Sequence, residues 1–138
     1  MARQKKQQHR KAAAVLNLRG RLWIEIDRAA AFTEAGADLL EQIHVCGSLS
    51  EAARRLRYSY RRAWMLIDAM NRAWPRPLVV TATGGKRGGG TKVTELGHEV
   101  LSAYRDLQIQ LEHLLDQGSV GVFKSANVPA DRRGSGPE

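Results

Sequence analysis

The feature that most constrains this chain of 138 residues is a run of local structural signals between Gly47 and Thr94. Ser48 precedes Glu51 by three residues, which is the spacing of a capping box, so a helix is predicted to begin there. It should continue to about Leu56. Its inward face is expected to be small and apolar, so that a following helix can pack closely against Leu49, Ala52, Ala53 and Leu56.

A turn at Arg57 and Tyr58 is predicted to lead into a longer helix. Ser59 should cap this helix, and the prolines that follow Trp74 should stop it. Helical spacing predicts a buried face made by Ala63, Ile67, Met70 and Trp74, with Trp64 beside them. The opposite face carries Tyr60, Arg61, Arg62, Met65, Ala69 and Arg72.

Two strands are predicted at residues 78–82 and 91–94, which are rich in Val and Thr. The loop between them holds five glycines together with Lys86 and Arg87. A short helix, a turn, a longer helix and a basic hairpin, in that order, predict a winged helix-turn-helix. The expected fold class is mostly α-helical with a small β-hairpin wing.

The flanking segments are expected to extend this motif into one domain over residues 18–117. Residues 1–17 read as a basic disordered arm and residues 118–138 as a flexible tail. A strand is predicted over residues 21–27 and a first helix over about residues 36–46, which Gly47 ends.

A last helix is predicted over about residues 95–116, with Thr94 as its cap. Apolar residues on it step by four and three in alternation, as in a coiled coil. This seam predicts a long dimerisation helix and a homodimer, and it consists of Val100, Tyr104, Leu107, Leu111 and Leu114.

Charge is distributed very unevenly along the chain. The net charge is +8, yet residues 54–92 alone hold ten bases against one acid, a net charge of +9. Residues 1–21 add seven bases and no acid, whereas residues 22–53 and 93–138 are net acidic. Positive charge concentrated on the predicted helix-turn-helix and its basic loop indicates a polyanion partner, because neutralised phosphates release condensed counterions.

The first residues of the longer helix are the ones that meet base edges when such a motif docks on DNA. Arginine can bind O6 and N7 of guanine with two hydrogen bonds at once. Serine hydroxyls and amides at helix starts suit phosphates, and the basic loop suits the DNA backbone. The predicted residues for binding double-stranded DNA are Ser48, Ser59, Tyr60, Arg61, Arg62, Met65, Lys86, Arg87 and Lys92.

Other chemistry finds little support in the sequence. The single cysteine, Cys46, excludes an internal disulfide and is expected to pack on an apolar helix face. The four histidines lack metal-ligand spacing and no nucleophile motif occurs, so neither a metal site nor an enzyme is expected. In the glycine-rich loop Lys92 falls one place too late for a nucleotide phosphate loop. Without a membrane span or a signal segment, a cytoplasmic, nucleoid-associated protein is the expectation.

Several of these elements resemble a known family. The stretches Ser59-Tyr-Arg-Arg-Ala-Trp64 and Ala82-Thr-Gly-Gly-Lys-Arg-Gly-Gly-Gly90, with Met70-Asn71 and Thr94-Glu-Leu-Gly97, are similar to the N-terminal DNA-binding domain of the molybdate-responsive regulator ModE. That domain is a LysR-type winged helix-turn-helix, and the resemblance covers about residues 18–117. It implies a homodimer on a palindromic operator, with the third helix in the major groove and the wing on the flanking backbone.

This chain also differs from the members of that family. Members of the family have C-terminal molybdate-binding modules, whereas this chain ends about 21 residues after its last predicted helix. Molybdate sensing through the family's usual site is therefore not expected, and no cofactor is predicted. The leading hypothesis is a sequence-specific transcriptional regulator. The alternatives are a nucleoid-type DNA binder of low specificity and an oxoanion-responsive or protein-interaction module that uses the glycine loop.

Overall fold

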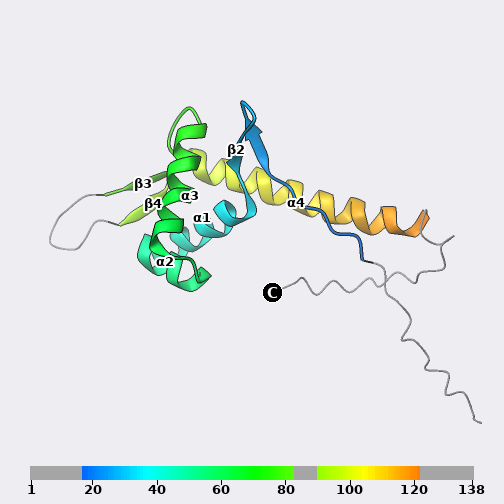
Figure 1. Ribbon diagram of the computed structural model, residues 1–138, viewed down its shortest axis with the longest axis horizontal. Coiled ribbons are helices and arrows are strands. Elements are labelled where there is room, and N and C mark those ends of the chain that lie inside the picture. The colour runs from blue at the N-terminus through cyan, green and yellow to red at the C-terminus, as the bar shows by residue number, and fades with distance from the viewer. Residues whose placement is uncertain (1–16, 83–89, 122–138) are drawn as a thin grey trace, which may run out of the picture. The chain divides into compact units, whose positions relative to one another are not determined.

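A computed structural model of the chain describes residues 17–82 and 90–121, with side chains as far as residue 118. Its contacts define two compact units, residues 21–109 and residues 1–20 with 110–138. The elements, labelled in Figure 1, are β1 (Ile24–Ile26), β2 (Ala29–Phe32), α1 (Glu34–Cys46), α2 (Leu49–Leu56), α3 (Tyr60–Ala73), β3 (Val79–Thr81), β4 (Thr91–Val93) and α4 (Glu95–Gly121). The chain is mostly helical with a small β-hairpin after α3, as the sequence predicted, and it has a second antiparallel hairpin before α1.

The sequence predicted a single strand before the first helix, whereas the structure has a hairpin there. The strand expected over residues 21–27 exists as β1, but it pairs with a second strand, β2, that was not predicted. Asp27 and Arg28 make the turn with φ of 51° and 67°, and positive φ at both central residues is the mark of a type I′ turn. Neither residue is glycine and β2 reads Ala-Ala-Ala-Phe, so the usual sequence signals of a hairpin are missing.

Helices α1, α2 and α3 surround one apolar core. Thr33 caps α1 by accepting a hydrogen bond from the Gly36 amide at 3.2 Å, so the helix begins two residues earlier than predicted. Gly47 ends it with φ of 66°, a left-handed conformation that glycine adopts without steric cost. The expected inward face of α2 is confirmed, because Leu49, Ala52 and Ala53 are buried and Leu56 is partly buried.

The buried face of α3 is confirmed with one correction. Ala63, Ile67 and Met70 are buried, and Trp74 donates a hydrogen bond from Nε1 to the Ala31 carbonyl at 3.1 Å. Trp64, however, is 41% exposed and does not join this face. Its position, one residue after the buried Ala63, turns it away from the core by about 100°.

The second hairpin is packed tightly against the start of α4. Strands β3 and β4 pair in the register Val79 with Val93 and Thr81 with Thr91. Thr94 caps α4, accepting from the Gly97 amide at 3.0 Å, as predicted. A Cβ at Gly97 would overlap the Leu78 carbonyl oxygen and lie 2.8 Å from Val93 Cγ1, so only glycine fits this approach.

Helix α4 differs from its prediction in length and in the role of its apolar seam. It ends at Gly121 rather than near Asp116. Val100 and Tyr104 are buried in the chain's own core, where the Tyr104 hydroxyl donates to the Leu22 carbonyl at 2.7 Å. The exposed part of the seam therefore begins at Leu107, which is 44% exposed.

A half-buried ion-pair network connects α4 to α1. Arg105 donates from Nη2 to Asp38 at 2.7 Å and from Nε to Glu41 at 2.6 Å. The hydrogen bond to Glu41, more than the one to Asp38, raises the pKa of Arg105 above its usual range. The network orients α4 on α1 more strongly than an exposed pair would, because its charges are partly shielded from water.

In the second unit, the extended residues 17–20 run close against α4. A Cβ at Gly20 would lie 3.1 Å from Leu115 and 3.3 Å from Leu111. Among the described residues, no helix combines the length and apolar character that crossing a lipid bilayer requires.

Candidate nucleic-acid interface

Both helices of the motif begin with a serine that caps them. The Ser48 hydroxyl oxygen accepts from the Glu51 amide at 3.2 Å, and the Ser59 hydroxyl oxygen accepts from the Arg62 amide at 3.1 Å. Each hydroxyl keeps its own proton to donate, and the first amides of each helix point outward with the positive end of the helix dipole. These helix starts have the chemistry that a phosphate needs.

Only half of the predicted capping box forms. The Glu51 carboxylate does not return to the Ser48 amide but accepts hydrogen bonds from Arg54 and Arg55, at 2.9 Å and 3.3 Å to their Nε atoms. The hydrogen bond from Arg54 is the main reason that the pKa of Glu51 is lowered to about 2. Two of the bases counted in the positive segment are thus partly neutralised within α2.

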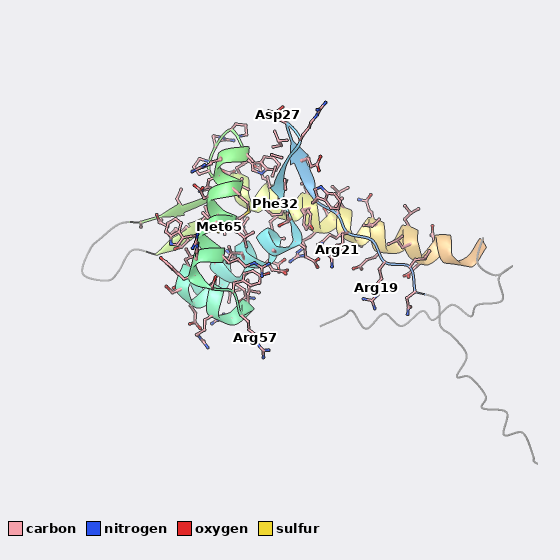
Figure 2. All side chains as sticks on the ribbon, viewed as in Figure 1. Arg19, Arg21, Asp27, Phe32, Arg57 and Met65 are labelled. Carbon is pink, nitrogen blue, oxygen red and sulfur yellow. The ribbon has the colours of Figure 1, made fainter. Side chains whose placement is uncertain are left out.

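The turn between the two helices is made by Arg57 in the left-handed conformation, with φ of 59°. The Tyr58 amide donates to the Ala53 carbonyl at 2.9 Å and closes the end of α2. A residue with a Cβ pays a steric cost at this φ, typically about 1 kcal/mol or more. Arg57 is exposed at the α2–α3 junction, where Figure 2 labels it. Its charge was not among the predicted site residues.

The outward stripe of α3, defined here as Arg61, Met65, Asp68 and Arg72, follows helical spacing and is exposed throughout. Met65 is 62% exposed and lies midway along α3 in Figure 2. Arg72 pairs with Asp68 at 3.1 Å, so their charges cancel. Arg61 has no hydrogen bond or ion pair to any residue that the structure describes, and it gives the stripe its net positive charge.

One flank of this stripe is aromatic and adjoins the wing. Tyr60 and Trp64 contact each other edge to face, with ring centroids 6.2 Å apart. Asn71 continues this flank, and its side-chain amide holds the wing strand. The Asn71 Oδ1 accepts from the amides of Leu78 and Val79 at 2.9 Å and 3.2 Å, and its Nδ2 donates to the Val79 carbonyl at 2.9 Å. Asn71 therefore fixes β3 beside α3, as Figure 1 shows.

On the other flank of the stripe, the side chain of Arg62 points in a different direction from that of Arg61. The guanidinium of Arg62 lies over the Tyr58 ring, 4.1 Å from its centroid, which is close enough for a cation–π interaction. Successive helical residues point about 100° apart, so Arg62 faces the α2–α3 turn while Arg61 faces outward.

An open groove of about 570 Å³ lies farther along, between α3 and the first hairpin, and is lined by residues that include Ile26, Ala29, Met65, Ala69 and Ala73.

Of the DNA-binding residues predicted on the wing, the structure describes Lys92. Lys92 is exposed in the middle of β4, paired with Val80 of β3. The adjoining Thr91 amide donates to the Gly47 carbonyl at 2.9 Å, which fastens the wing to the end of α1. Lys86 and Arg87 lie outside the described residues.

The predicted site residues that the structure describes thus lie in four places. Tyr60, Arg61 and Met65 share the outer surface of α3. Ser59 and Arg62 lie at the start of that helix, facing the turn, while Ser48 caps α2 and Lys92 lies on the wing. The structure adds Arg57, Trp64 and Asn71, which sequence reasoning did not assign to the site. Trp64 was placed on the core side. The stretches that carry the family resemblance include both Trp64 and Asn71, whereas Arg57 was predicted only as a turn residue.

A capped short helix and a longer helix across a tight turn, followed by a β-hairpin packed beside the longer helix, define the chain as a winged helix-turn-helix protein with a long C-terminal helix. No protein-family model matches the chain.

Curated proteins do match it. The chain is 39% identical over 97 residues to the molybdenum transport protein ModE of Azotobacter vinelandii, across 70% of this chain and 36% of that protein. It is 36% identical over 110 residues to the transcriptional regulator ModE of Haemophilus influenzae, across 80% of this chain and 41% of that protein. It is 40% identical over 74 residues to the DNA-binding transcriptional dual regulator ModE of Escherichia coli K12, across 54% and 28%. The chain is therefore ModE-like over most of its length, and it spans about two fifths or less of the length of these relatives.

Proposed function

We propose that this chain binds double-stranded DNA in a sequence-specific manner and regulates transcription. The observation that carries the proposal is the outward stripe of α3, where Arg61 is exposed and has no partner among the described residues. An arginine in this state is available to bind guanine in the major groove without first breaking an ion pair. The relatives from Haemophilus influenzae and Escherichia coli, a transcriptional regulator and a DNA-binding transcriptional dual regulator, support the same function.

Each part of the site has a distinct role in the proposed complex. Arg61, Tyr60 and Met65 contact base edges, while Ser48, Ser59, Arg57 and Arg62 contact the phosphates on either side of the groove. The wing follows the backbone beyond α3 through Lys92, together with Lys86 and Arg87 in the loop. Asn71 touches no DNA but holds the wing at the position from which it does.

The chain is further proposed to act as a homodimer through α4. Leu107 and Leu114 are 44% and 64% exposed, and apolar side chains repeated at this spacing along a helix favour pairing with a second helix. Two copies related by a twofold axis match an operator with two half-sites. Sedimentation at micromolar concentration should show a dimer, whereas a single-chain species alone would contradict this part of the proposal.

Selection of binding sites from a random duplex library tests the proposed function. A regulator should enrich one motif and prefer it over unrelated DNA by roughly 10³-fold or more at physiological salt. Uniform binding with steep salt dependence would favour a nucleoid-type binder instead. If neither DNA mode appears, titration with molybdate and tungstate, read as a shift in melting temperature, tests the oxoanion alternative.

A further inference from the structure

Three large apolar side chains lie exposed on the helix proposed to read DNA. Tyr60 is 53% exposed, Trp64 is 41% exposed and Met65 is 62% exposed, although α3 has a well-buried opposite face. Tyr60 and Trp64 already contact each other with ring centroids 6.2 Å apart, so they form one continuous aromatic surface. Clustered apolar groups that stay in water at a functional surface usually mark a binding site.

This surface lies beside Arg61, which has no partner among the residues that the structure describes. Trp64 follows Arg61 by three residues and Met65 follows it by four, so both are its neighbours on the helix surface. Tyr60 and Trp64 lie on the same flank of the stripe as Asn71, which holds the wing strand. A base contacted by Arg61 therefore has Trp64 as a neighbour on the same helix surface.

The charge around the surface decides which ligand fits. Residues 54–92 hold ten bases against one acid, and Arg57, Arg61 and Arg62 are all exposed around the start of α3. An apolar protein partner would have to desolvate these cations, whereas DNA supplies phosphates to pair with them. In the major groove the apolar group that base edges present is the 5-methyl group of thymine.

We propose that Trp64 and Tyr60 contact thymine 5-methyl groups and so select thymine at positions next to the base that Arg61 contacts. This inference rests on the proposed function and deepens it, because it assigns part of the sequence preference to apolar contact rather than to hydrogen bonds. The indole and phenol rings cover a methyl group that would otherwise remain hydrated, which favours thymine over cytosine at the same position.

Exchange of thymine for deoxyuridine tests the inference, because it removes the methyl group and leaves base pairing intact. Each thymine of the selected site is replaced in turn, and equilibrium affinity is measured at fixed salt. At the contacted positions affinity should fall about three- to tenfold, as expected for one buried methyl group. In Trp64→Ala or Tyr60→Ala the ratio of thymine to deoxyuridine affinity should fall toward one at those positions, because the partner of the methyl group is gone.

Trp23→Ala is the matched control, since Trp23 is 53% exposed and belongs to the segment before β1 rather than to α3. It should leave the thymine-to-deoxyuridine ratio unchanged. The inference is overturned if deoxyuridine binds as well as thymine at every position, or if both α3 variants keep the ratio of the original protein. Failure to select any preferred site would instead overturn the proposed function, so the two failures are distinguishable.

Discussion

Arg57 combines a backbone conformation that a side chain disfavours with a proposed phosphate contact. Its φ of 59° is one that glycine adopts freely and that a side chain disfavours. We expect Arg57→Gly to stabilise the protein by up to about 1 kcal/mol, the relief of strain being partly offset by the greater freedom of glycine in the unfolded chain.

The same substitution should weaken DNA binding. Loss of one phosphate contact lowers the slope of log affinity against log salt by roughly 0.9. Urea denaturation and binding titrations at several salt concentrations check both effects. A less stable variant would show that the conformation of Arg57 is not strained, and an unchanged salt slope would show that Arg57 makes no phosphate contact.

Glu51 provides a test by pH. Its pKa is lowered from 4.5 to about 2, so the carboxyl adds stability that is fully present above pH 4.5 and is lost as the pH falls toward 2. The effect should be small, because the ion pairs with Arg54 and Arg55 are exposed to solvent. A carbon-detected NMR titration of the Glu51 carboxyl should give a midpoint near 2. A midpoint near 4.5 would mean that the carboxylate does not hold these arginines in solution.

The wing depends on the side-chain amide of Asn71. Asn71→Ala removes the acceptor of the Leu78 and Val79 amides and the donor to the Val79 carbonyl. Leaving these buried groups without partners should cost about 1–3 kcal/mol in the free energy of unfolding. Asn71→Asp keeps the acceptor and should lose less, as measured by urea denaturation. Equal losses in the two variants would show that the accepted hydrogen bonds do not anchor the strand.

The junction between the wing and α4 depends on the absence of a side chain at Gly97. Gly97→Ala brings a Cβ against the Leu78 carbonyl oxygen and Val93, so we expect a destabilisation of about 1–3 kcal/mol. Gly118→Ala is the control on the same helix, because no atom lies within 4 Å of its added Cβ. It should stabilise α4 by about 0.5–1 kcal/mol. Thermal melts that move in the same direction for both variants would refute the tight approach at Gly97.

Local signals predicted most elements of the fold. Capping serines, terminal glycines and helical spacing act within a few residues, so α2, α3 and the second hairpin were predicted close to their observed bounds. Strand β2 was missed because its alanines carry little strand preference and its pairing with β1 decides its conformation. The seam of α4 was only partly interpreted, since periodicity cannot tell whether Tyr104 packs on a second copy or on Phe32 of the same chain, 5.1 Å away.

The sequence could indicate candidate site residues, but not which of their side chains face the same way or are paired with other side chains. The sequence placed Arg61 and Arg62 together, yet the ring of Tyr58 holds Arg62 toward the turn. The charge count over residues 54–92 included Arg54, Arg55 and Arg72 at full charge, yet each has a carboxylate partner. Ion pairs and ring contacts depend on where side chains end, and a linear pattern of charges does not contain that information.

Across the whole molecule, we expect sequence preference to depend on the few cations of α3 that have no carboxylate partner among the described residues, rather than on the net charge of +8. Arg61 and Arg28 carry the same charge and are both exposed, but Arg61 lies on α3 and Arg28 in the turn of the first hairpin. Removal of either charge changes the net charge equally, so the two variants separate position from charge.

The most direct test is the affinity of Arg61→Gln and Arg28→Gln for a selected site and for unrelated DNA at one physiological salt concentration. We expect Arg61→Gln to lose about 1–3 kcal/mol of binding free energy at the selected site and much less on unrelated DNA. The ratio of the affinity for the selected site to the affinity for unrelated DNA should therefore fall. Arg28→Gln should keep the ratio of the original protein. An unchanged ratio in Arg61→Gln, or equal losses in the two variants, would contradict the assignment of α3 as the reading helix.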